Sequence, residues 1–335
     1  MRTFARPVIV ASRCLGFAPC RYNGLVIADP FVAQLAPHVE YVTPCPEVDL
    51  GLGVPRDPIR VVKMAGELRL VQPATGRDIT QATRQYVETF LASLGEVDGF
   101  ILKTRSPSCG IKEVKVYPGP GKVQAIGHTR GFFGGAIWER FPHLAVEDEG
   151  RLNNWRIREH FLTRIFTLAA FRAVKAEATM QALVRFQAEN KLLLMSYHQE
   201  EMRLLGKIVA NHEKLPLATV LAEYQRHLWA ALARPPRCAS AINVLMHALG
   251  YFSAQLTSQE KQFFLETLER FRQGQVPLSV PNHLMRSWIV RFQEKYLAQQ
   301  TFFAPYPDGL IESAQMPAPC TGRDYWKQDG TDDPA

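Results

Sequence analysis

The sequence predicts an α/β domain built on a mostly parallel sheet, followed by an all-α domain. Two patterns carry this prediction. Strand and helix signals alternate over residues 1–147, and such alternation is typical of a parallel sheet covered by helices on both faces. From Arg151 onward no strand pattern remains, and helical segments follow one another. The length of 335 residues also favours two domains, which we place at 1–147 and 148–318, with a flexible tail at 319–335.

Short local signals predict the elements of the first domain. Apolar runs predict three strands, at residues 7–12, 39–43 and 99–103. Asp29 followed by Pro30 predicts a short capped helix, because proline fits the first helical position. Asp78 and Gln81 have the spacing of a capping box, and helical periodicity follows over residues 80–94.

Amphipathic or buried helical patterns account for the second domain, with breaks at prolines between several of them. The predicted helices span residues 157–175, 178–193, 197–210, 216–233, 239–253, 258–272 and 281–300. Together they predict a helical bundle.

Composition predicts a cytoplasmic protein that does not act at a membrane. Hydrophobic residues make up 47% of the chain and charged residues 21%, and no apolar run approaches the roughly 20 residues that cross a bilayer. The apolar stretch behind the basic start is too short for a signal peptide. In a reducing cytosol the six cysteines indicate metal binding or catalysis rather than disulfides.

The positive charge of the chain is concentrated in its second half. Residues 1–150 hold 17 basic and 15 acidic side chains, whereas residues 151–318 hold 20 and 13. The tail at 319–335 holds two basic and four acidic residues. This asymmetry favours a polyanionic partner for the second domain.

Three cysteines follow the three predicted strands. Cys14, Cys45 and Cys109 should therefore meet, since loops at the carboxyl ends of parallel strands converge on one edge of the sheet. A structural zinc site takes four ligands, usually in close pairs, and this chain has no Cys-x-x-Cys. Three thiolates with an open position suit an iron–sulfur cluster with one unligated iron. The alternative is three incidental buried cysteines, which are common.

Four motifs around these cysteines resemble the thiouracil desulfurase family (TudS-like proteins). They are Ser12-Arg-Cys14-Leu-Gly16, Cys20-Arg-Tyr-Asn-Gly24, Pro44-Cys-Pro-Glu-Val48 and Lys103-Thr-Arg-Ser-Pro-Ser-Cys-Gly110. The resemblance continues through Gly76-Arg-Asp-Ile-Thr80 and covers most of residues 8–140. In the helical half, Asn190-Lys-Leu-Leu-Leu-Met-Ser-Tyr197 and Leu205-Gly-Lys-Ile-Val-Ala210 resemble the YbgA-like domain. The fusion of the two resembles bacterial tRNA 4-thiouridine desulfidases (RudS-like proteins).

The resemblance implies a Rossmann-like sheet domain and a 4Fe–4S cluster held by Cys14, Cys45 and Cys109. Cys20 lies in the same loop as Cys14 and is the alternative ligand; the resemblance favours Cys14. The implied reaction is hydrolytic. The open iron binds the thione sulfur of 4-thiouridine and polarises the carbon–sulfur bond, and water attacks the ring carbon without net redox change.

Further site residues are assigned around the predicted ligands. Glu47 and Ser106 are the candidate catalytic residues, Glu47 as the base for water. Arg21, Tyr22, Asn23, Lys103 and Ser108 are the candidate substrate-binding residues, since an extruded uracil needs an aromatic face and polar contacts at its edge. The alternatives are a helix cap or an ion pair with Arg21 or Lys103 for Glu47, serines that serve the loop backbone, and a plain turn at Asn23-Gly24. Family members often carry Asp at position 23.

The predicted partner is a tRNA that carries 4-thiouridine. Arg151, Arg156, Arg158 and Arg164 follow the first domain and are candidates for contacts to the RNA backbone, unless they are solvated helix faces. Two other functions compete with this one. The first is a desulfurase of free thiouracil or thiouridine, and the second is a non-catalytic iron–sulfur RNA-binding protein.

Overall fold

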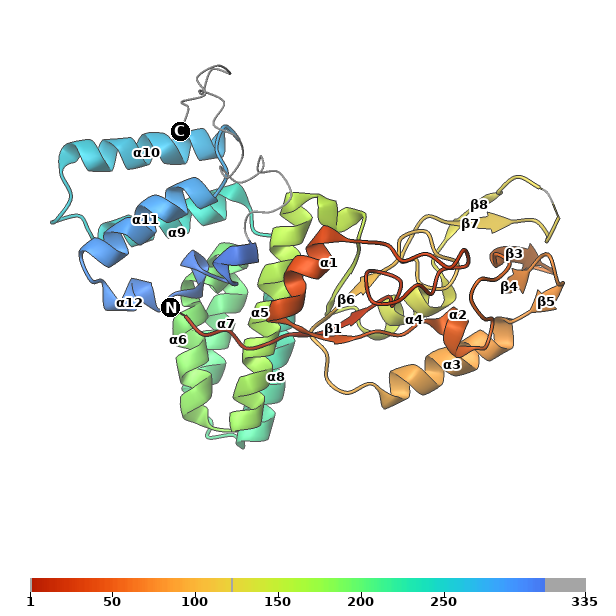
Figure 1. Ribbon diagram of the computed structural model, residues 1–335. Helices are drawn as coiled ribbons and strands as arrows, with labels where there is room; N and C mark the ends of the chain where they lie inside the picture. The colour runs from red at the N-terminus through yellow and green to blue at the C-terminus, as the bar shows by residue number, and fades with distance from the viewer. Residues whose placement is uncertain (1, 122, 311–335) are drawn as a thin grey trace, which may run out of the picture.

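The structure of the protein, a computed structural model, describes residues 2–121 and 123–310 (Figure 1). The predicted tail at 319–335 lies outside the described residues. The first sheet contains β1 (Val8–Ala11), β2 (Glu40–Val42), β6 (Gly99–Leu102) and β9 (Ala145–Asp148). Its strand order is β2-β1-β6-β9 and all its pairings are parallel, which confirms the predicted sheet.

Alternate residues of this sheet face two different layers of helices. Ile9, Ile101 and Ala145 pack in one core with α1 (Pro30–Leu35) and with the first turns of α5 (Trp155–Glu177). Val10 and Phe100 pack in the opposite core with α3 (Thr80–Ser93) and α4 (Phe132–Arg140). The central strands are buried on both faces, and this explains their continuous apolar runs.

A second, mixed sheet was not predicted from the sequence. It contains β3 (Arg60–Met64), β4 (Glu67–Gln72), β5 (Arg77–Asp78), β7 (Val114–Tyr117) and β8 (Gly127–Thr129), in the order β5-β4-β3-β7-β8. Several of its side chains are exposed and its own core is small, so its strands carry little apolar signal. The capping box predicted at Asp78 forms only in part. Asp78 ends β5 and its Oδ1 accepts the Thr80 N–H at 2.9 Å, but the N-cap residue of α3 is Ile79.

From residue 151 to residue 310 the structure describes helices and no strand, as predicted. After α5 these are α6 (Met180–Tyr197), α7 (Gln199–Ala210), α8 (Leu217–Ala231), α9 (Cys238–Gly250), α10 (Ser258–Arg272), α11 (Ser279–Arg291) and α12 (Lys295–Ala298). The helix predicted at 281–300 is split into α11 and α12 where Gln293 takes a positive φ. None of the described helices has the length and apolar character needed to cross a membrane.

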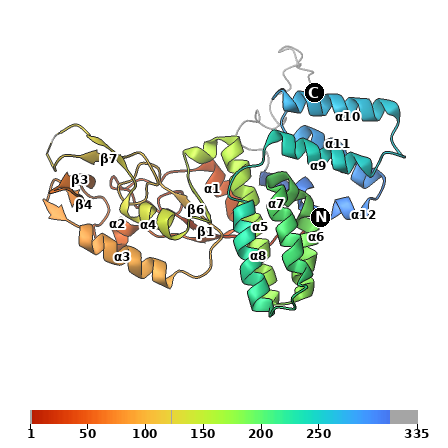
Figure 2. The ribbon, with the colours of Figure 1, turned by 180° about the vertical axis from the view of Figure 1, so that it is seen from behind.

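The long helix α5 joins the two halves of the molecule (Figures 1 and 2). Its residues Phe161 and Ile165 pack against the parallel sheet, while Phe171 and Val174 pack in a core that extends to α6 and α8. Both faces of one helix therefore tie the halves together through apolar contacts.

Candidate functional site

The three predicted cysteines lie together at the carboxyl edge of the parallel sheet. Cys14 follows β1, Cys45 follows β2 and Cys109 follows β6. In the sheet, β1 lies between β2 and β6, so the connections in this region run toward both edges of the sheet. Open α/β sheets form their ligand crevice at such a point. The thiols of Cys45 and Cys109 both lie within electrostatic range of the Cys14 thiol. Cys45 and Cys109 are buried and Cys14 is half-buried.

The donor set, three cysteines from three loops, is of the kind that holds an iron–sulfur cluster. Among the described residues, no group of three or more His, Cys, Asp or Glu side chains converges as around one metal ion. A cluster needs no such convergence, because each thiolate binds a different iron. The Cys20 thiol lies near those of Cys45 and Cys14, as its place in the same loop as Cys14 predicts. The three thiols of Cys14, Cys45 and Cys109 are the donors that a 4Fe–4S cluster takes, and they stay the predicted ligands, with Cys20 as the alternative.

Polar groups lie close to two of the cysteine sulfurs. Cys45 is the N-cap residue of the short helix α2 (Pro46–Asp49), and the Val48 backbone opposes in part the rise of its pKa. Ser12, which is buried, hydrogen-bonds Cys109 through its hydroxyl, and the same hydroxyl accepts the Lys103 N–H at 3.0 Å. Burial raises the pKa of Cys14 to about 11 and that of Cys45 to about 12, and it also raises the pKa of Cys109 well above its usual value. The thiols are therefore neutral until a metal displaces their protons.

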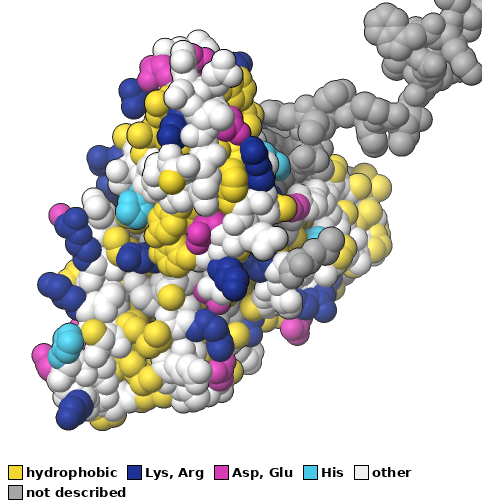
Figure 3. All heavy atoms as spheres, turned by 90° about the vertical axis from the view of Figure 1, so that its left-hand side faces the viewer, with side chains coloured by type: hydrophobic (Ala, Val, Ile, Leu, Met, Phe, Trp, Pro, Cys, Tyr) yellow, Lys and Arg dark blue, Asp and Glu magenta, His cyan; other side chains and the backbone are white. Residues whose placement is uncertain are grey.

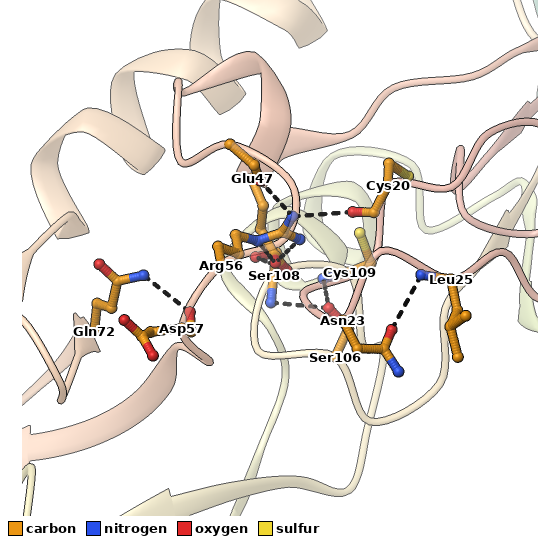
Figure 4. Close-up of polar contacts among 11 residues, drawn as sticks. Cys20, Asn23, Leu25, Glu47, Arg56, Asp57, Gln72, Ser106, Ser108 and Cys109 are labelled. Atoms are coloured by element: carbon orange, nitrogen blue, oxygen red, sulfur yellow. Dashed lines mark hydrogen bonds and ion pairs between the residues drawn. The ribbon is translucent and has the colours of Figure 1, made fainter.

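Glu47 is fixed on both of its carboxylate oxygens (Figure 4). Oε2 accepts hydrogen bonds from Nε and Nη2 of Arg56, the former at 3.0 Å, and Oε1 accepts the Ser108 hydroxyl at 3.0 Å. The Arg56 side chain is only 4% exposed, and its Nη1 also donates to the carbonyls of Cys20 and Gly53. Arg56 thus ties the Cys20 loop to the helix that carries Glu47.

The two serines of the Cys109 loop have different partners. The Ser106 hydroxyl accepts the backbone N–H groups of Ser108, at 3.2 Å, and of Cys109, at 3.1 Å. Ser108 is buried and its hydroxyl contacts Glu47. The sequence favours Ser106 for catalysis and Ser108 for loop geometry or substrate contact. In the structure Ser108 contacts the candidate base, and Ser106 shapes the loop.

Ion pairs account for the other charges around the cysteines. Lys103, predicted to bind substrate, pairs with Glu149, whose second oxygen accepts the Thr104 N–H at 2.8 Å. Arg13 pairs with Asp49 at 2.9 Å. The sequence analysis missed Glu149 because it did not predict β9. Glu149 directly follows that strand, so its place at a carboxyl strand end would have indicated it. Arg56 has no comparable sequence signal, since it lies in an irregular loop.

The predicted base-contacting residues lie on an exposed turn. Tyr22 is 44% exposed and Asn23 is exposed, while Arg21 is half-buried. The Asn23 side-chain oxygen accepts the Leu25 N–H at 3.3 Å, so it serves the turn. Tyr22 and Asn23 therefore face solvent on the loop that follows Cys20.

Two of the four predicted RNA-contacting arginines point into the protein. Arg158 is 8% exposed and donates to the Leu152 carbonyl, and Arg164 donates to the His143 carbonyl. Both guanidinium groups therefore donate to backbone carbonyls of this chain. Arg151 pairs with Glu147, and Arg156 is exposed beside Trp155.

Comparison with known proteins gives a separate match for each half of the chain. A family model described as 2-thiouracil desulfurase matches residues 9–149, and a model described as a protein of unknown function (DUF1722) matches residues 191–307. The uncharacterized protein YbbK of Bacillus subtilis (strain 168) is 34% identical over 110 residues, which cover 31% of this chain and 73% of YbbK. The uncharacterized protein YbgA of Escherichia coli (strain K12) is 28% identical over 158 residues, covering 47% of this chain and 94% of YbgA.

One solved structure is also similar. It is the 4Fe-4S-dependent thiouracil desulfidase TudS, which is 27% identical and covers 44% of this chain and 93% of its own, with a TM-score of 0.34. The two family matches confirm the resemblance of each half. The chain belongs to the 2-thiouracil desulfurase family over residues 9–149, and it carries a YbgA-like DUF1722 domain over residues 191–307.

Proposed function

We propose that this protein is a tRNA 4-thiouridine desulfidase that removes sulfur hydrolytically, with a 4Fe–4S cluster held by Cys14, Cys45 and Cys109. The observation that carries the proposal is the meeting of three cysteines with Glu47 and Ser108 at one sheet edge. The family match supports a thiouracil-type substrate, and the name of TudS supports the cluster.

The side chains of the site supply the proton chemistry of hydrolysis. Held by Cys14, Cys45 and Cys109, a bound cluster would supply Lewis-acid chemistry toward the thione sulfur. Glu47 takes a proton from the attacking water at Oε1, while Arg56 holds Oε2 in place. The Ser108 hydroxyl shares Oε1 and orients the same water. Water and thione yield a carbonyl and hydrogen sulfide, so no electron donor is consumed.

The helical half supports an RNA substrate through its charge. Residues 151–318 hold 20 basic and 13 acidic residues. Arg203 and Lys207 lie exposed one turn apart on α7. On the face seen in Figure 3, Lys and Arg side chains are spread among acidic and apolar ones rather than gathered in one patch. A diffuse excess of this kind favours contacts to phosphates without sequence preference.

The test is a comparison of substrates. Anaerobically reconstituted protein is incubated with 4-thiouridine-containing tRNA, with free 4-thiouridine and with free 2-thiouracil. We expect loss of the 4-thiouridine absorbance band from tRNA, with release of hydrogen sulfide. Turnover of the free bases alone would support a free-thiobase desulfurase. RNA binding without turnover of any substrate would support a non-catalytic iron–sulfur protein.

A further inference from the structure

A turn beside the site exposes a group of apolar side chains. Tyr22, Leu25, Val26 and Val54 are 44%, 58%, 46% and 41% exposed. They lie on neighbouring segments: a Cβ on Gly24 would touch the Val54 side chain at 3.9 Å, and the Arg56 N–H donates to the Tyr22 carbonyl at 2.7 Å. We call these four residues, with Arg21, the turn surface. Grouped exposed apolar side chains mark interaction sites more often than single ones do.

The turn surface continues directly into the candidate site. Cys20 precedes it in the chain, is buried and lies near the thiol of Cys45. Arg56 binds the carbonyl of Cys20 with its side chain and the carbonyl of Tyr22 with its backbone N–H, and it also holds Glu47. Figure 4 shows Cys20, Asn23 and Leu25 along one loop beside Arg56. A ligand that covers the turn surface therefore lies next to Glu47, the proposed general base.

The turn is held in place before any ligand arrives. The Gly24 N–H donates to the Arg21 carbonyl at 2.9 Å, and Gly24 has a φ of 74°, which favours glycine. Asn23 accepts the Leu25 N–H within the same turn. A surface that is already ordered loses little conformational entropy on binding.

The side chains of the turn surface suit a nucleotide. The Arg21 guanidinium lies 5.7 Å from the centre of the Tyr22 ring, and within the described part of the chain Arg21 makes no ion pair. An exposed aromatic ring beside a cation that lacks a carboxylate partner provides a face for base stacking and a charge for phosphate. With 44% of its surface in solvent, Tyr22 does not form the wall of a dry base pocket.

We propose that the turn surface binds the nucleotide adjacent to the thiolated base in an RNA strand, rather than the thiolated base itself. This inference rests on the proposed desulfidase function. The neighbouring base stacks on Tyr22 and packs against Leu25 and Val54, and Arg21 contacts the phosphate between the two nucleotides. The turn surface is thus the feature of the catalytic half that separates an RNA substrate from a free base.

The experiment compares Tyr22→Ala and Arg21→Ala holoenzymes on two substrates. One is a short RNA oligonucleotide with a single 4-thiouridine, and the other is free 4-thiouridine. We expect kcat/KM for the oligonucleotide to fall about 10-fold or more for Tyr22→Ala, mainly through KM, because stacking on one aromatic ring is lost. Activity on free 4-thiouridine and iron content should not change. Tyr22→Phe should keep most of the oligonucleotide activity.

The matched control is Phe263→Ala, which removes an aromatic ring that is 57% exposed on α10, outside the turn surface. This variant should leave kcat/KM unchanged for both substrates. Equal losses on both substrates for Tyr22→Ala would place the ring against the thiolated base and overturn the inference, as would no loss on either. Anisotropy binding of the sulfur-free oligonucleotide tests the same contacts without turnover. A wild-type enzyme that binds this RNA through Tyr22 but releases no sulfide would refute the desulfidase function alone.

Discussion

The Ser108 hydroxyl donates a hydrogen bond of 3.0 Å to Oε1 of Glu47, across 61 positions of the chain. Ser108 precedes Cys109 in the loop after β6, whereas Glu47 lies on α2 after β2. The contact therefore links the loops of two proposed cluster ligands. Since Arg56 occupies the other oxygen, Glu47 is held in one orientation at the mouth of the site. This arrangement distinguishes the roles of the two serines.

Ser108→Ala should lower turnover without loss of the cluster. The hydroxyl contacts a carboxylate, and hydrogen bonds to charged groups contribute about 1.5–3 kcal/mol, so kcat should fall roughly 10- to 100-fold. Ser106→Ala should instead reduce iron content, because two backbone N–H groups of the Cys109 loop lose their acceptor. Activity per bound cluster separates the two effects. Lower turnover per cluster for Ser106→Ala, with loss of iron for Ser108→Ala, would instead favour Ser106 as the catalytic serine.

Strand ends were predictable from the sequence, and so was the gathering of the cysteines. Parallel strands bring their carboxyl ends to one edge whatever the side chains, so the order of strands and thiols along the chain was sufficient for Cys14, Cys45 and Cys109. Arg56 could not be found in this way. Its role depends on a loop that folds back over the Cys20 turn, and no periodicity encodes that path.

The helical half was predictable for a different reason. Long amphipathic segments such as α10 repeat their signal over several turns, and Thr257 and Glu260 add a capping box. The mixed sheet gave too little signal to find, since β5 and β8 are only two and three residues long. Strands that short have almost no periodicity of their own.

Arg56→Gln should destabilise the protein and also reduce turnover. The Arg56 side chain is 4% exposed and the Glu47 side chain is 15% exposed, and breaking a buried pair costs about 3–5 kcal/mol. The free energy of unfolding from denaturant titration, together with kcat, measures the two effects.

The matched control is Arg105→Gln. Arg105 pairs with Glu113 in the same region, but these side chains are 70% and 50% exposed, so the change should cost less than about 1 kcal/mol. Similar losses of unfolding free energy and kcat in both variants would mean that the Arg56–Glu47 pair contributes no more than an exposed pair.

Serine substitutions should separate the cluster ligands from Cys20. Cys14→Ser, Cys45→Ser and Cys109→Ser should each lose most bound iron after reconstitution. Cys20→Ser should retain it, because the predicted ligand in this loop is Cys14 and Cys20 only lies beside the ligands. Iron and sulfide analysis and the visible absorbance of the cluster provide the measurement, with Cys238→Ser, an exposed cysteine of α9, as control. An essential Cys20 with a dispensable Cys14 would reverse the assignment.

Gly134→Ala should impair cluster binding from outside the site. The amino end of α4 packs directly on the Cys109 loop, where the Phe133 N–H donates to the Ser108 carbonyl at 2.9 Å. A Cβ on Gly134 would lie 2.3 Å from the Cys109 carbonyl oxygen, so the loop must move. Overpacking of this kind costs about 1–3 kcal/mol. We expect lower iron content, whereas Gly135→Ala, whose nearest contact is the Arg130 side chain at 3.3 Å, should be milder.

Glu159 should make the stability of the protein depend on pH near neutrality. Burial raises the pKa of this α5 carboxyl from about 4.5 to about 7, and Arg156 opposes the shift only in part. Tyr197 of α6 and Tyr306 also face it. Because the folded pKa is the higher one, the stabilisation is complete below pH 4.5 and is lost as the pH rises through 7.

Glu159→Gln should remove this loss, which is on the order of 2–3 kcal/mol between pH 4.5 and pH 8. Neighbouring His160 acts in the opposite sense. Burial lowers its pKa from 6.5 to about 3, so its stabilisation is present above pH 6.5 and is lost as the pH falls toward 3. The effect of Glu159 must therefore be taken as the difference between wild type and variant in urea titrations at pH 5 and pH 8. Equal pH dependence in both proteins would mean that Glu159 is solvated rather than buried.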